Sequence, residues 1–167
     1  MPGPAAILPK VSASLFKTAY KVGEPIDVTA TLENAGTESF YVPKQIGESS
    51  GSIPGFDIVL LHNGKPFCHT IRDYVCSATR QKRSSTEQLL NEHFLLLPPG
   101  GLIGIHIHLE TSCWLPHSEP APPGTYEVQV AYYASDPCVP DLSNRRAQFP
   151  ILQSTVNGEP IHLELNQ

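Results

Sequence analysis

Residues Ile26–Glu33 read IDVTATLE and decide the fold class, because apolar and polar side chains alternate at every position. A period of two is typical of a β-strand that buries one face and exposes the other. The segment 103–110 (IGIHIHLE) repeats this alternation, and the segment 126–132 (YEVQVAY) does so again. These three strands predict a β-sheet protein with a core built from alternate residues.

Weaker patterns indicate the rest of the secondary structure. Asn63-Gly64 predicts a tight hairpin, and Asn157-Gly158 indicates another. Ser84, with Glu87 three residues later, is typical of a capping box and predicts a short helix within the loop 70–99. Further strands are expected over residues 15–20, 39–42, 56–60, 65–69, 148–152 and 161–165.

The length and composition favour a single globular domain. The chain has 167 residues, including 17 Pro and 12 Gly, which suits many short strands joined by turns. We therefore predict an all-β protein: an immunoglobulin-like antiparallel β-sandwich of about eight or nine strands with one short helix in an inserted loop. Residues 1–10 are expected to form an N-terminal tether, and residues 11–167 the domain.

Charge and hydropathy exclude several classes of partner. The net charge is −5, and only 16% of the residues are charged, so no basic stripe is present to bind nucleic acid. No run approaches the roughly 20 apolar residues that a membrane-spanning helix needs. We expect no membrane insertion and no cofactor. The compartment is left open, an exported protein that has lost its signal being one alternative, and the sequence does not indicate an oligomeric state.

The order of several turn motifs resembles a known family. Residues 20–26 (YKVGEPI), 97–100 (LPPG) and 123–126 (PGTY) resemble motifs of bacterial immunoglobulin-like domains. Their order is similar to that of the intracellular proteinase inhibitor domain of the BsuPI type. The resemblance implies the sandwich fold and, as an alternative function, proteinase inhibition. Tyr126 is expected to have a structural role, donating a hydrogen bond across a corner of the fold.

Histidines on one strand raise the question of a metal site. His106 and His108 share one strand face, and His162 lies on the last strand, so a metal ion would be held if the two strands were neighbours. No surrounding partner residues are evident for such ligands. A solvated sheet face and no metal are therefore expected, with a metal-dependent enzyme as the alternative. No nucleophile or phosphate-loop motif is present, so we predict a protein that is not an enzyme.

The long loops offer the candidate binding surface. If successive strands run antiparallel, the loops 44–55, 70–99 and 134–147 emerge at one end of the domain, where such folds place recognition. We predict a non-enzymatic binding or accessory module whose partner is a protein or a polysaccharide. The opposing interpretations are a solvated loop, or an insertion that covers a sheet edge. The candidate binding residues are Arg72, Tyr74, Arg80, Lys82, Arg83 and Arg145.

Four cysteines, Cys68, Cys76, Cys113 and Cys138, permit three pairings. Cys76 and Cys138 both fall in long loops expected at the same end. We predict that these two pair if the protein matures in an oxidising compartment, and that the thiols are free if it does not.

Overall fold

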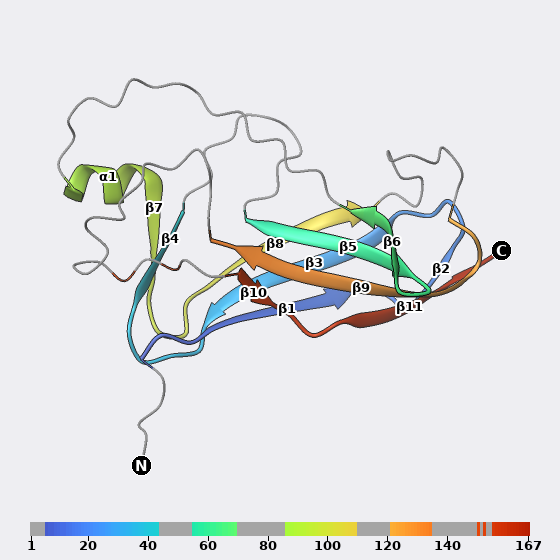
Figure 1. Cartoon of the computed structure of the whole chain (residues 1–167), viewed down its shortest axis with the longest axis horizontal. Coiled ribbons are helices and arrows are strands. Elements are labelled where there is room, and N and C mark those ends of the chain that lie inside the picture. The colour runs from blue at the N-terminus through green and yellow to red at the C-terminus, as the bar shows by residue number, and fades with distance from the viewer. Residues whose placement is uncertain are drawn as a thin grey trace, which may run out of the picture.

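The structure is a computed structural model, and it describes residues 6–43, 55–69, 86–109, 121–134, 150, 152 and 155–167. Within these residues the chain is all-β, with eleven strands in three sheets (Figure 1). The first sheet contains β1 (Pro9–Leu15), β3 (Ile26–Asn34) and β8 (Leu102–Leu109). The second contains β2 (Ala19–Lys21), β11 (Ile161–Asn166), β9 (Gly124–Tyr133), β5 (Phe56–His62) and β6 (Lys65–His69), with β10 (Thr155–Asn157) also on β9. The third pairs β4 (Phe40–Pro43) with β7 (Phe94–Leu97), directly after the helix α1 (Thr86–His93).

Strand β3, which contains the alternating segment Ile26–Glu33, lies at the centre of the first sheet. Residues along β3 alternate strictly between buried and half-buried from Ile26 to Asn34. Strands β1 and β8 pair with β3 on either side, both antiparallel. The sheet therefore has one face in the core and one face that carries Asp27, Thr29 and their neighbours.

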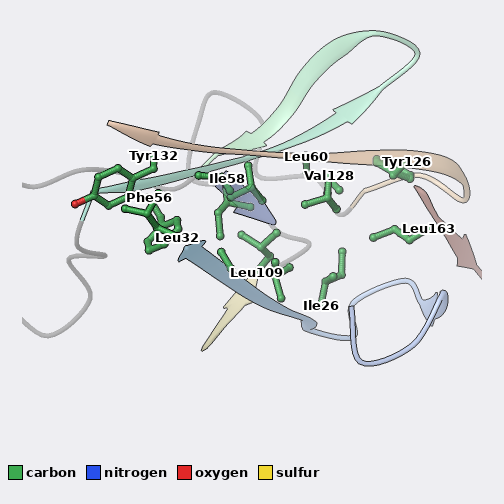
Figure 2. Packing of buried hydrophobic residues seen from close by; sticks show 14 of the residues in the cluster. Ile26, Leu32, Phe56, Ile58, Leu60, Leu109, Tyr126, Val128, Tyr132 and Leu163 are labelled. Carbon is green, nitrogen blue, oxygen red and sulfur yellow. The ribbon is translucent and has the colours of Figure 1, made fainter. Parts of the chain in front are cut away.

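One hydrophobic cluster joins the first and second sheets. Val28 and Leu32 of β3 are fully buried, as are Ile58 of β5 and Val128 of β9, and all four belong to the same cluster. Figure 2 shows the apolar side chains of these strands pointing into a common interior. The core expected from the alternating residues is confirmed for Val28, Leu32, Tyr126, Val128 and Val130. Ile105 and Ile107 of β8 are only partly buried, although they pack against the cluster.

The Asn63-Gly64 hairpin is confirmed. Asn63 and Gly64 have φ angles of 51° and 73°, and they connect β5 to the antiparallel β6. Positive φ at both central residues is the requirement of a type I′ turn, whose twist matches that of the strands it joins. Glycine meets this requirement without strain, and asparagine tolerates it better than most residues.

Two of the weaker predictions are wrong, one of a strand and one of a hairpin. No single strand covers residues 15–20: β1 ends at Leu15, β2 begins at Ala19, and Phe16 between them is 83% exposed. The two strands belong to different sheets, because the chain crosses from one sheet to the other here.

Asn157-Gly158 does not form a hairpin either. Strands β10 and β11 do not pair with each other, and both pair antiparallel with β9, β10 at residues 131–133 and β11 at residues 124–128. Gly158 continues this edge, because its N–H donates to the Val130 carbonyl at 2.8 Å. Of the expected strand 148–152, the structure describes only Pro150 and Leu152. Both residues hydrogen-bond to the backbone of Tyr41 in β4.

Tyr126 has the expected corner contact. Its hydroxyl donates to the Pro122 carbonyl at 2.7 Å, four residues upstream, and its side chain is buried. Burial raises the pKa of the Tyr126 hydroxyl. The contact fixes the entry of the chain into β9. No helix among the described residues is long and apolar enough to cross a bilayer.

Candidate functional site

His106 and His108 lie side by side on the outer face of β8. Along the strand, the two histidines alternate with the half-buried Ile105 and Ile107. Both imidazoles therefore project away from the core. The two side chains are 55% and 64% exposed. Their ring centroids are 5.2 Å apart, with the ring planes at 89°. The prediction that these histidines share one strand face is confirmed.

Asp27 of β3 joins this histidine pair. The register of β3 with β8 places Asp27 directly opposite His108. Asp27 Oδ1 contacts Nδ1 of His108 and lies 3.6 Å from Nε2 of His106. The three donor atoms all lie within 4.8 Å of one another. Two imidazole nitrogens and one carboxylate oxygen, converging from neighbouring strands, are a set of ligands that binds divalent transition metals.

Thr29 holds one of the two rings. Thr29 is directly opposite His106 in the register, and its hydroxyl lies 3.1 Å from His106 Nδ1. When that hydroxyl accepts the Nδ1 proton, the lone pair of His106 is on Nε2, the nitrogen that faces Asp27. Thr29 is thus the kind of outer partner that orients a ligating histidine.

His162 is not part of this cluster. It lies on β11, which pairs with β9 and β2 in the second sheet and not with β8. It is exposed and sits opposite Glu127. The condition under which the β8 histidines and His162 would share a metal ion is therefore not met, and the carboxylate beside the β8 histidines is that of Asp27 on β3.

Asp27 and Thr29 were both missed in the sequence. The signal was present, because they occupy polar positions of the alternating segment 26–33, on the same sheet face as one another. What the sequence lacks is the register of β3 against β8. That register is a long-range property, and no local turn connects the two strands to fix it.

The candidate loop residues Arg72, Tyr74, Arg80, Lys82, Arg83 and Arg145 lie outside the described residues, as do Cys76, Cys113 and Cys138 and the side chain of Cys68. The structure does describe the residues that flank these loops.

One group of flanking residues meets where β5 begins and β9 ends. The Tyr133 N–H donates to the Gly55 carbonyl at 2.7 Å. Gly55 follows the segment 44–54, and Tyr133 lies just before the segment 135–149. Figure 1 shows the start of β5 beside the end of β9. His69, which precedes the segment 70–85, is paired with Val59 on the neighbouring strand.

A second group of flanking residues meets at β4 and β7. The Tyr41 N–H donates to the Pro150 carbonyl at 2.8 Å, so the segment 135–149 ends beside Tyr41. Tyr41 is two residues before Pro43, after which the segment 44–54 starts. Pro43 is paired with Phe94, the first residue after α1, and α1 begins where the segment 70–85 has ended. The segments 44–54 and 135–149 therefore both run between these two places, whereas the segment 70–85 starts beside β5 and ends at α1, the helix that leads into β7.

Comparisons with known proteins identify no family. No family model matches the sequence, and no curated protein matches it. Among solved structures, the chain is similar to a β-glucosidase from Listeria innocua in complex with glucose (TM-score 0.47, 12% identity), covering 99% of this chain but 17% of the glucosidase. It is also similar to a CARDB domain from Pyrococcus furiosus in complex with di-metal ions (TM-score 0.42, 9% identity). That likeness covers 95% of this chain and 93% of the CARDB chain.

Spo0M, a sporulation control protein from Bacillus subtilis, has a TM-score of 0.43 and 12% identity, with 99% of this chain and 51% of Spo0M covered. All three TM-scores are below 0.5, and these likenesses indicate no function for this chain. The resemblance to the BsuPI-type inhibitor domain stays a prediction.

Proposed function

We propose that the chain is a non-enzymatic binding module that presents the segments 44–54, 70–85 and 135–149 to a protein or polysaccharide partner. The observation that supports the proposal is the shared anchoring of these segments. The segments 44–54 and 135–149 connect the end of the second sheet where β5 starts and β9 ends with the β4–β7 pair, and the segment 70–85 connects β6 with α1, the helix that leads into β7. Rigid strands or a helix hold the ends of these segments, which is how such folds position loops for recognition.

The proposed scaffold is an immunoglobulin-like β-sandwich, in which the β1–β3–β8 sheet packs on the sheet built around β9. Its support is the single cluster to which apolar residues of both sheets contribute. In such a sandwich, loops at one end are the usual place for recognition, because their sequences vary without disturbing the core. Arg72, Tyr74, Arg80 and Arg145 are of residue types enriched in binding hot spots.

A matched pair of triple variants tests the proposal. Arg72→Ala, Arg80→Ala and Arg145→Ala remove three cations from the proposed binding segments. Lys10→Ala, Lys21→Ala and Lys65→Ala remove three exposed cations from the described strands and carry the same change in charge. Each purified protein is assayed for retention on chitin, cellulose, xylan and peptidoglycan. Each is also cross-linked in an extract of the source organism, and the adducts are identified by mass spectrometry.

The proposal predicts that one ligand is retained by the wild type and by the lysine variant, and that the arginine variant retains it about tenfold less. Equal retention by all three proteins would contradict the proposal, because binding would then not involve the loop segments. Inhibition of a protease panel by the wild type, lost in the arginine variant, would replace the proposal with the BsuPI-type alternative.

The cysteine prediction bears on the same surface. Cys76 and Cys138 belong to the segments 70–85 and 135–149, which start after β6 and β9, the two strands that flank β5. A bridge between them would close a loop of about 60 residues, worth roughly 4 kcal/mol in the chain-entropy description. It would also lower the entropy cost of ordering the two segments on binding. Non-reducing peptide mapping of protein matured in an oxidising compartment should recover this pair, and a Cys68–Cys76 bridge would contradict it.

A further inference from the structure

We propose that Asp27, His106 and His108 bind one divalent transition-metal ion, of the class of Zn²⁺, on the outer face of the β1–β3–β8 sheet. This site is separate from the proposed binding segments. The ligands would be Oδ1 of Asp27, Nε2 of His106 and Nδ1 of His108, the three atoms that converge in the structure.

The first argument for the site is the spacing of the donors. Ligands at the usual Zn–N and Zn–O lengths of about 2.0–2.2 Å lie roughly 3.3 Å apart in a tetrahedral site. Asp27 Oδ1 and His106 Nε2 are already 3.6 Å apart, and the widest separation in the set is at most 4.8 Å. Bringing the three donor atoms to the spacing of a tetrahedral site needs side-chain shifts on the order of 1 Å. Both imidazoles are more than half exposed, so their rotation meets little resistance.

The second argument is the state of the Asp27 carboxylate. Its Oδ1 is closed to solvent and accepts no aligned hydrogen bond from the described residues, although two imidazole nitrogens face it. A carboxylate oxygen that is shielded from water and left without a hydrogen bond is costly. A cation bound between this oxygen and the two nitrogens would remove that cost.

The third argument is the orientation of His106 by Thr29. The Thr29 hydroxyl 3.1 Å from Nδ1 directs Nε2 toward Asp27, as the outer partners of ligating histidines do. The sequence alone shows no such partner, and for that reason it predicts no metal. The register of β3 against β8 supplies this partner.

The arrangement also indicates what kind of site it is. Three protein ligands leave one position of a tetrahedral ion open to solvent or to a fourth ligand, unlike a closed four-ligand structural site. The ion would cross-link β8, an edge strand of its sheet, to β3. We therefore expect an exchangeable ion that stabilises the edge of the sheet.

Isothermal titration of the metal-free chain with ZnCl₂ tests the proposal. The ligand variants are Asp27→Asn, His106→Ala, His108→Ala and the double histidine variant. His162→Ala is the matched control, because it removes one exposed histidine from the other sheet. Thermal unfolding of each variant in EDTA verifies that the fold is retained. The double variant also measures binding by the histidines and cysteines elsewhere in the chain.

We expect one ion per wild-type and His162→Ala chain, with affinity weakened by about tenfold or more in each ligand variant. The Thr29→Val variant should bind Zn²⁺ about 10- to 100-fold more weakly than the wild type, the usual cost of removing an outer partner. Zn²⁺ should also raise the melting temperature of the wild type and not that of the double variant.

Co²⁺ in place of Zn²⁺ should give the visible absorption of tetrahedral coordination in the wild type and lose it in the double variant. Equal Zn²⁺ affinity in the wild type and the double variant would overturn the proposal. No binding to the wild type would overturn it as well, and the Asp27 contacts would then be those of a simple ion pair with protonated histidine.

Discussion

Replacing Asn34 by Asp is expected to destabilise the protein strongly, although the two side chains have almost the same shape. Asn34 is fully buried at the end of β3. Its amide nitrogen donates to the carbonyls of Glu38 at 2.8 Å and Leu97 at 2.9 Å, and its Oδ1 accepts the Gly36 N–H at 3.0 Å. The residue thus ties the turn after β3 to the end of β7.

The magnitude follows from the two donors that are lost. A buried acceptor left without its partner costs about 1–3 kcal/mol, which applies to the Leu97 carbonyl. The Glu38 hydrogen bond is only part-buried, so its loss costs about 0.5–1.5 kcal/mol. The Asp oxygen would also face the carbonyls that the amide now contacts. The free energy of unfolding should fall by about 2–4 kcal/mol at neutral pH.

Urea unfolding, followed by far-UV circular dichroism, measures this difference. Asn157→Asp is the matched control, because Asn157 is exposed on β10, and a surface change of this kind should stay within about 0.5 kcal/mol of the wild type. An Asn34→Asp variant as stable as the control would show that the two amide hydrogen bonds do not hold the turn.

Three further perturbations have defined outcomes in the same assay. Tyr126→Phe removes the corner hydrogen bond and should cost about 0.5–1.5 kcal/mol, and no loss would refute a structural role for the hydroxyl. Val128→Ala should lower the free energy of unfolding by about 1–4 kcal/mol, because Val128 is fully buried. Ile105→Ala should lower it by less, although isoleucine is the larger side chain, because Ile105 is only partly buried. A larger loss for Ile105→Ala than for Val128→Ala would contradict the packing. The hydrogen bond from Lys17, then that from a backbone N–H, lowers the pKa of Glu24. The stabilisation by the Glu24 carboxylate is therefore present above the unfolded pKa of about 4.3 and is lost as the pH falls through the folded pKa. The difference in free energy of unfolding between the wild type and Glu24→Gln should shrink as the pH is lowered.

The burial pattern predicted from the sequence is reproduced best in β3, which has a neighbour on both sides. β3 has β1 and β8 beside it, and its alternation is reproduced at every position. The same alternation in β8 predicted burial for Ile105 and Ile107, which are only partly buried. β8 is an edge strand of its sheet, and a pattern of residues does not report how many neighbours a strand has.

Where the prediction failed, the missing information was long-range. Nothing local distinguishes residues 16–18, where the chain leaves one sheet for the other, from the interior of a strand. Asn157-Gly158 has the composition of a hairpin turn, yet the strands on either side of it both pair with β9. The same limitation hid the Asp27 partner of His108, because strand alternation gives the face of a residue and not its cross-strand neighbour.

The two proposed sites lie toward opposite ends of the strands and should act independently. Tyr133, beside the anchors of the loop segments, is the last residue of β9, whereas Gly124, its first residue, is paired with Leu165 of β11. β11 is also paired with β2, and the short turn after β2 leads directly to Ile26, so Asp27 lies at the end where β9 begins (Figure 1). Sites that share no residue and no connecting loop have no direct route for coupling. Asp27→Asn should therefore leave retention of the partner unchanged, and the triple arginine variant should bind Zn²⁺ as the wild type does. A change in both properties from either variant would mean that the perturbation acts on the fold, which separates a loss of stability from the loss of a site.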